Sequence, residues 1–87
     1  MGSTVEVFIV RAFSRQIVRM PLPQDVPVSE LLGEIAQRLE LPYPVQQLGL
    51  YNLTRDFEYI RTETLRQRGV GAGDLLLIAP GSSGCPR

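Results

Sequence analysis

One segment with helical periodicity, flanked by strand-like segments, most constrains what this 87-residue chain can fold into. The segment is entered through residues 25–29 and runs to about Leu39, and Pro27 suits its start because proline lacks the N–H that a first helical turn leaves unpaired. Its apolar side chains recur three and four positions apart. They are Leu31, Leu32, Ile35, Ala36 and Leu39. A lone helix must bury such a stripe against other elements, so we predict that the stripe is core and not a partner-binding groove.

Two strands are predicted before this helix. Residues 4–12 are rich in β-branched and aromatic side chains, and residues 16–22 follow after a short turn. The two segments together read as a hairpin. Pro21 and Pro23 lie at its end, where a residue that cannot donate to a sheet ladder is tolerated.

Three further strands are predicted after the helix. Residues 48–53 and 57–61 are separated by a turn, and residues 64–70 form one helical turn that closes on a glycine able to adopt a positive φ. The final strand, residues 75–79, is apolar at every position, which predicts a place in the middle of the sheet. The expected fold is α+β, with the order ββαββ, in which the short strand at residues 57–61 is not counted, and with a central last strand.

The length of the chain allows one hydrophobic core. We expect one domain over residues 1–80 and a flexible Gly/Ser-rich tail over residues 81–87. No internal repeat or low-complexity linker divides the chain.

The composition argues against several classes of function. Nine basic and nine acidic residues balance, and no stretch gathers one sign of charge, so a nucleic-acid-binding role is not expected. The apolar run at residues 75–80 is too short to cross a membrane, and the first residues do not resemble a signal peptide. With a single cysteine, Cys85, no intramolecular disulfide can form. A cytoplasmic protein is expected.

No group of residues in the sequence predicts catalysis. The chain has no histidine to act as a base for a serine or cysteine nucleophile. Metal ligands at close spacing are missing, and residues 71–73 lack the lysine and the following helix of a phosphate-binding loop. We therefore expect a protein that is not an enzyme and that uses no cofactor or metal.

Two local strings resemble the ubiquitin superfamily. The string PVQQLGLY at residues 44–51 is similar to the loop and third strand of ubiquitin, and TLRQRGV at residues 64–70, followed by Gly73-Asp74, is similar to a signature shared by these domains. Residues 25–32 and the hairpin at residues 52–56 most resemble the bacterial YukD/EsaB branch, which belongs to type VII secretion loci and ubiquitin-like operons. The resemblance covers residues 4–80. It implies a ubiquitin-like β-grasp fold, a mixed sheet with one main helix packed on one face.

The resemblance to ubiquitin directs attention to the tail. With Leu75, Leu77 and Ala79 pointing into the core, five residues follow the last strand, as in ubiquitin, and Gly84 takes the place of the reactive terminal glycine. Ser82 and Ser83 are small enough for a narrow enzyme channel, although ubiquitin has Gly where Ser83 stands. Residues 85–87, beginning with Cys85, then resemble a precursor extension that a peptidase removes. The alternative interpretation is a functionless tail.

The same register predicts an apolar surface on the outer face of the sheet. If Val5, Val7 and Ile9 face the core, alternation puts other apolar side chains outside. The predicted partner-binding residues are Phe8, Val10, Phe13, Leu48, Leu50, Leu76 and Ile78. A contiguous exposed apolar patch usually marks a partner site. Coverage by the chain's own loops or a homodimer seam are the alternatives.

Three functions follow from the resemblance. The first is a bacterial protein modifier, processed to Gly84, activated, and conjugated to targets, whose lack of lysine would prevent isopeptide chains on itself. The second is a non-conjugated YukD/EsaB-like component of type VII secretion that acts by docking. The third is a sulfur carrier. The implied partners are proteins in each case: activating and conjugating enzymes, a processing peptidase, targets, or a secretion assembly.

Overall fold

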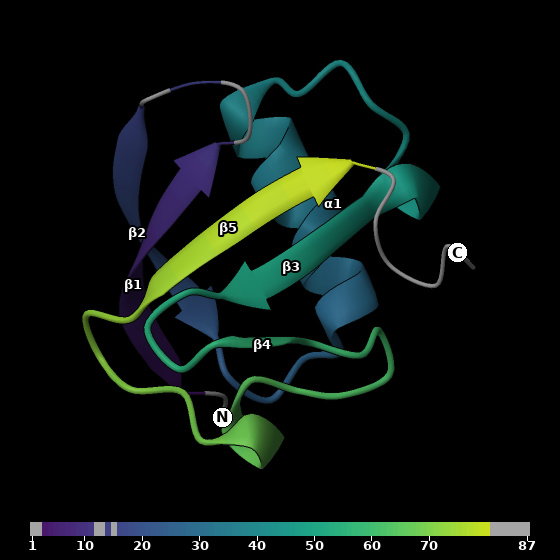
Figure 1. Ribbon diagram of the computed structural model, residues 1–87. Coiled ribbons are helices and arrows are strands. Elements are labelled where there is room, and N and C mark those ends of the chain that lie inside the picture. The colour runs from purple at the N-terminus through teal and green to yellow at the C-terminus, as the bar shows by residue number, and fades with distance from the viewer. Residues whose placement is uncertain (1–2, 12–13, 15, 81–87) are drawn as a thin grey trace.

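Five strands form one mixed sheet in the computed structural model, which describes residues 3–11, 14 and 16–80 (Figure 1). The strands are β1 (Thr4–Arg11), β2 (Ile17–Pro23), β3 (Leu48–Asn52), β4 (Phe57–Glu58) and β5 (Leu75–Pro80). Their order is β2-β1-β5-β3-β4, so β5 is central, as its uninterrupted apolar sequence predicts. β5 runs parallel to β1 and antiparallel to β3. The predicted α+β arrangement is confirmed.

One main helix, α1 (Val28–Leu39), packs on a single face of the sheet and lies behind it in Figure 1. The core lies between the two. The helical residues that it buries are Val28, Leu31, Leu32, Ile35 and Ala36. The first N–H groups of α1 donate to the chain that precedes β5, from Val28 to the Glu63 carbonyl at 2.8 Å and from Ser29 to the Arg61 carbonyl at 3.0 Å. The predicted apolar stripe is therefore core.

Two short 3₁₀ helices complete the described part of the chain. η1 (Val45–Gln47) leads into β3, and η2 (Arg66–Arg68) lies in the predicted helical turn between β4 and β5. η2 ends at Gly69, whose φ of 76° is a conformation that a residue with a Cβ adopts at a steric cost. This confirms the role that the sequence predicts for this glycine.

The fourth strand is shorter than predicted. Residues 57–61 were expected to be extended, but β4 contains only Phe57 and Glu58. Tyr59 still donates to the Leu50 carbonyl at 2.9 Å, and the chain then turns away so that the Arg61 carbonyl can accept from Ser29 at the start of α1. Capping the helix therefore ends this strand.

The predicted register of the last strand was wrong by one residue. Leu76 and Ile78 are buried in the core, whereas Leu75, Leu77 and Ala79 lie on the outer face and are half-buried. Leu48 and Leu50 of β3, also expected outside, are fully buried as well. Cross-strand partners share a face, and Leu76 pairs with the core residue Ile9, while Leu50 pairs with Ile78. An all-apolar strand gives no sign of which of its two faces is inward, which explains the error.

Both edges of the sheet are poor templates for another strand. β2 forms one edge and carries Pro21 and Pro23, which have no N–H to donate. β4 forms the other edge and is only two residues long.

Candidate binding surfaces

The outer face of the sheet, opposite α1, carries a group of apolar side chains. We call this group the outer-face patch, and its members are Phe8, Val10, Ile17, Tyr51, Leu75, Leu77 and Ala79. Strand pairing brings them together, because Val10 lies opposite both Ile17 and Leu77, and Tyr51 lies opposite Leu77 on the other side. Ile17 is 56% exposed and the other members are half-buried. Figure 1 looks onto this face.

The patch retains only part of the surface predicted from the sequence. Phe8 and Val10 lie where they were expected. Leu48, Leu50, Leu76 and Ile78 do not, because they face α1 and belong to the core. Phe13 lies outside the described residues. The sequence did not identify Ile17, Tyr51, Leu75, Leu77 and Ala79 as surface residues, although with the correct register the same alternation would have found them.

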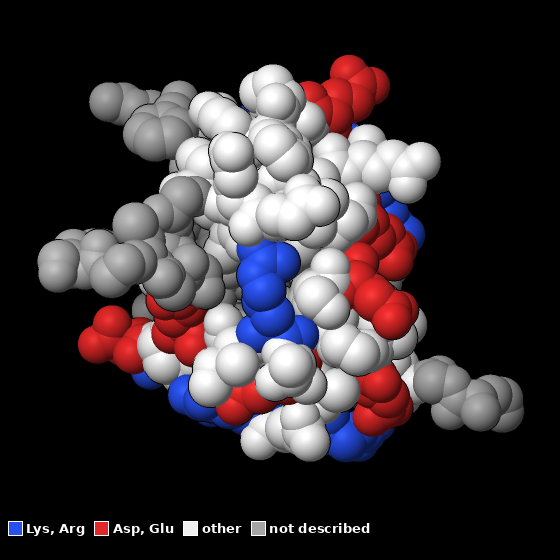
Figure 2. Space-filling model, turned by 90° about the vertical axis from the view of Figure 1, so that its right-hand side faces the viewer, with Lys and Arg blue, Asp and Glu red and all other residues white. Residues whose placement is uncertain are grey.

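Charged residues of both signs lie beside the patch. Glu6 and Arg19 form an exposed ion pair at 3.8 Å next to Phe8. At the other border Glu58 lies opposite Tyr51, and its Oε2 atom is buried without a hydrogen-bond partner in the described part of the chain. Figure 2 shows acidic and basic side chains distributed over a neighbouring face, with an uncharged area in its upper central part. The visible charges thus form no basic stripe of the kind that binds nucleic acid.

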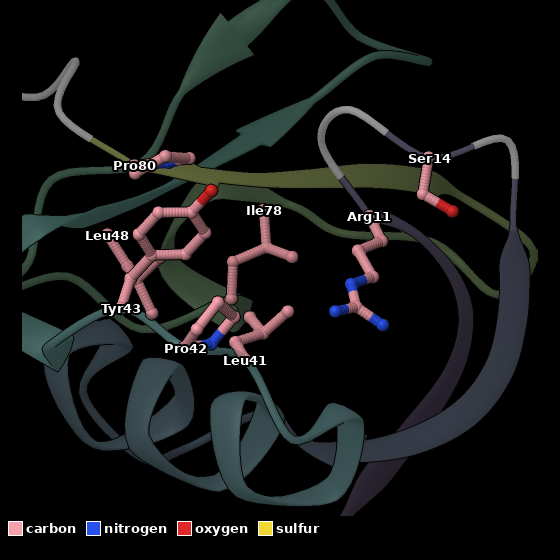
Figure 3. A pocket seen from close by; sticks show the side chains of 8 residues that line it. All are labelled: Arg11, Ser14, Leu41, Pro42, Tyr43, Leu48, Ile78 and Pro80. Carbon is pink, nitrogen blue, oxygen red and sulfur yellow. The ribbon is translucent and has the colours of Figure 1, made fainter.

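A cavity of about 360 Å³ opens at one end of the sheet (Figure 3). It lies between the loop that follows α1 and the ends of β1 and β5. The loop contributes Leu41, Pro42 and Tyr43, and the strands contribute Arg11, Ile78 and Pro80. In Figure 3 Tyr43 and Arg11 extend from opposite sides of the cavity, with Ile78 and Leu41 between them. The sequence alone does not indicate this site, because its residues come from three distant segments and share no motif.

Arg11 differs from the other arginines that the structure describes. Five of them form ion pairs with Asp or Glu: Arg19, Arg38, Arg55, Arg66 and Arg68. Arg61 instead donates to three backbone carbonyls, those of Val45, Gln46 and Leu48. Within the described residues only Arg11 has neither kind of partner for its guanidinium.

The opposite end of the sheet holds a compact polar cluster of Asn52, Arg55, Tyr59 and Asp74. The Asp74 Oδ2 atom accepts hydrogen bonds from Asn52 Nδ2 at 3.0 Å, Arg55 Nε at 2.8 Å and the backbone N–H of Gly71 at 3.0 Å. Asn52 Nδ2 also donates to the Tyr59 hydroxyl at 3.0 Å. These bonds join the β3–β4 turn to the chain just before β5, so the role of the cluster is structural.

The cluster shifts the ionisation of two of its members. Burial alone would raise the pKa of the Asp74 carboxyl, but the hydrogen bonds from Arg55, Asn52 and the Gly71 amide more than offset burial, and the pKa lies below its ordinary value. Burial raises the pKa of Tyr59 above its ordinary value, and the hydrogen bond from Asn52 offsets only part of this effect. Both shifts favour the state present at neutral pH, a charged Asp74 and a neutral Tyr59.

Two other kinds of site are absent from the described residues. In residues 3–11, 14 and 16–80 no three His, Cys, Asp or Glu side chains gather closely enough to hold a metal ion. None of the helices in those ranges has the length and apolar character needed to cross a membrane.

The predicted conjugation residues Ser82, Ser83, Gly84 and Cys85 lie outside the described residues. The expected position of Gly84 nevertheless depended on the incorrect register of the last strand. Moving the inward positions by one residue moves the counted position to Ser83 or Cys85. Neither is a glycine, so the count no longer supports Gly84 as the reactive residue.

Comparison with known proteins identifies the type of fold. No model of a known protein family matches the sequence, and no curated protein sequence matches it. Solved structures do match. The ubiquitin of Caldiarchaeum subterraneum has a TM-score of 0.73 and 19% identity, covering 94% of this chain and 99% of that one. The ubiquitin-like domain of Plasmodium falciparum Dsk2 has a TM-score of 0.72 and 15% identity, covering 91% of this chain and 100% of that one.

A third match is to part of a larger protein. Protomer 1 of the ESX-3 core complex has a TM-score of 0.74 and 25% identity, covering 98% of this chain but only 18% of that one. With the mixed five-stranded sheet and its single packed helix, these matches show that the chain has the ubiquitin-like β-grasp fold. Domains of this fold typically act as modules without enzymatic activity.

Proposed function

We propose that this ubiquitin-like domain is a protein-docking module of a larger bacterial assembly and that it binds its partner through the outer-face patch. The observation that carries the proposal is the apolar outer face itself. α1 covers only the inner face, and Ile17 remains 56% exposed beside Val10 and Leu77. An apolar surface bordered by charged residues is typical of a protein interaction site.

Two similarities favour a secretion assembly as the setting. Residues 25–32 and 52–56 resemble YukD/EsaB-like proteins of type VII secretion. The match to protomer 1 of the ESX-3 core complex covers nearly all of this chain and a small part of a much longer one. Both similarities suit a domain that contributes a binding surface within a multi-protein complex on the cytoplasmic side.

A protein modifier is the alternative function. It draws on the shared ubiquitin fold and on the Gly/Ser-rich tail, but the corrected register takes away the count that pointed to Gly84. A sulfur carrier would depend on the same tail and has less support, because such carriers usually end in a Gly-Gly pair. The docking function needs no processed terminus.

The intact mass of the protein purified from its native host separates these alternatives. For a docking module we expect one species without loss of residues 85–87 and no heavier covalent adducts in the same lysate. A species that ends at Gly84, together with adducts on other proteins, would overturn the docking proposal in favour of a modifier.

Substitution within the patch tests the docking surface directly. We expect Leu77→Arg to weaken co-purification with the partner assembly from the native host by about tenfold or more, because it puts a charge in the centre of the apolar contact. The matched control is Gln37→Arg, which adds the same charge to an exposed position on α1. Equal retention by both variants would contradict the proposal. A self-association that Leu77→Arg abolishes in sedimentation experiments would show a homodimer seam instead.

A further inference from the structure

The cavity beside Arg11 is separate from the outer-face patch. Its floor is made by side chains that face α1, whereas the patch lies on the opposite face of the sheet. We propose that this cavity binds the free C-terminal carboxylate of a peptide whose last residue is apolar, and that Arg11 pairs with that carboxylate. The proposal does not depend on the docking role of the patch.

Arg11 gives the cavity a positive charge, which favours an anionic ligand. Six of the seven arginines in the described residues are held by carboxylates or backbone carbonyls, and Arg11, at the cavity, has neither. Arg11 is half-buried, and it lines the cavity together with the apolar side chains of Leu41 and Ile78. A carboxylate matches the planar fork of a guanidinium and can accept two parallel hydrogen bonds from it.

The shape of the site fits one apolar side chain next to that carboxylate. Leu41 and Ile78 lie between Arg11 and Tyr43 in Figure 3, so an apolar group placed there would contact both while its carboxylate reaches Arg11. A volume of about 360 Å³ is at the small end of the range for ligand sites and is too small to receive a helix. Ile78, at the floor of the cavity, is fully buried.

The loop that forms one wall is held in place before any ligand binds. Arg61 donates through one nitrogen, Nη2, to the carbonyls of Val45 at 3.0 Å and Gln46 at 2.9 Å, and to that of Leu48. These bonds fix the segment that follows Tyr43 against the start of β3. Arg61 is thus a positioning residue, and a preformed wall lowers the entropy lost on binding.

The test is an NMR titration of the ¹⁵N-labelled full chain with acetyl-Gly-Gly-Leu, once as the free acid and once as the C-terminal amide. We expect the free acid to bind about tenfold more tightly or better, because only the acid forms a charge-assisted pair with Arg11. The amide signals of Leu41 and Ile78 should move, and those of Phe8 and Tyr51 should not. Arg11→Gln should reduce the preference for the acid to less than about twofold, and Arg11→Lys should restore part of it.

A matched control and a second ligand complete the experiment. Arg38→Gln removes a cation from α1, where Arg38 pairs with Glu34 at 2.7 Å, and should leave the preference unchanged. Equal binding of acid and amide, or no binding of either, would overturn the proposal. So would octanoate binding as tightly as the peptide acid in an Arg11-dependent manner, because that result would assign the cavity to fatty acids.

Discussion

The two ends of the β3–β5 strand pair hold polar groups in opposite states. At the end where β3 finishes and β5 starts, Asp74 accepts three hydrogen bonds and Asn52 donates two. At the other end, where Leu48 pairs with Pro80, the Arg11 guanidinium has no carboxylate or carbonyl partner in the described residues. At the first end the polar side chains bond to one another, and at the second end a cavity lies beside Arg11.

This difference separates a structural role from a binding role. A buried polar group that lacks a partner destabilises the fold, so a cluster whose members satisfy one another maintains the fold. A half-exposed cation keeps part of its hydration and can remain unpaired at little cost until a ligand arrives. Substitutions at the polar cluster should therefore reduce stability, whereas substitution of Arg11 should reduce binding.

The largest expected effect is that of Asp74→Ala. It leaves the Asn52 amide and the Gly71 N–H without their acceptor, and we expect the free energy of unfolding to fall by about 3 kcal/mol. Urea denaturation at neutral pH measures the loss. Glu34→Ala on the exposed side of α1, where the carboxylate forms only a surface pair, is the control and should cost less than about 1 kcal/mol. Similar losses in the two variants would mean that the cluster does not stabilise the fold.

A smaller effect is expected from acid. Because the pKa of Asp74 is lowered in the folded state, its charged form stabilises the fold above the ordinary pKa, and this contribution is lost as the pH falls through the lowered pKa. The free energy of unfolding should therefore decrease between about pH 5 and pH 2, and the decrease should be shallower in Asp74→Asn. Urea titrations at several pH values measure both slopes. Equal pH dependence in the original protein and in Asp74→Asn would contradict the role of the Asp74 carboxylate in stability.

Removal of one hydroxyl from the polar cluster should lower the free energy of unfolding by less than the two changes above. Tyr59→Phe leaves one N–H of the Asn52 side chain without an acceptor, and we expect a loss of about 1 kcal/mol. The measurement is the urea midpoint at neutral pH. Tyr51→Phe, on the outer face, is the matched control and should change the midpoint less. A midpoint that Tyr59→Phe changes no more than Tyr51→Phe would show that the hydroxyl of Tyr59 is not needed.

The smallest effect on stability is expected at the cavity. Arg11→Gln breaks no ion pair among the described residues, so the free energy of unfolding should change by less than about 0.5 kcal/mol. Thermal unfolding followed by circular dichroism measures the change. A loss above about 2 kcal/mol would place Arg11 in the structural group and remove the contrast between the two ends.

The sequence predicted the fold well because the fold depends on periodicity. The helical spacing of Leu31, Leu32 and Ile35 and the uninterrupted apolar run of β5 identify the core helix and the central strand without knowledge of contacts. The short β4 could not be foreseen, since it ends where a carbonyl caps a helix that lies far away in the sequence.

The candidate sites were harder to predict for a physical reason. In a strand such as LLLIA both faces are apolar, and only the pairing of Leu76 with Ile9 reveals which face is inward. The cavity and the polar cluster each bring together residues from distant segments. The Gly73-Asp74 pair and the hairpin at residues 52–56 each stood out in the sequence as part of a resemblance, but nothing in the sequence indicated that Asp74 bonds to Asn52 and Arg55.

The two edges of the sheet have a consequence for how such a domain behaves when chains are crowded. An extended edge with free N–H groups recruits strands from neighbouring molecules and seeds aggregates. Here Pro21 and Pro23 interrupt one edge, and the other edge is a two-residue strand. Neighbouring molecules are therefore not expected to join their sheets edge to edge, so contacts between molecules would be made by side chains.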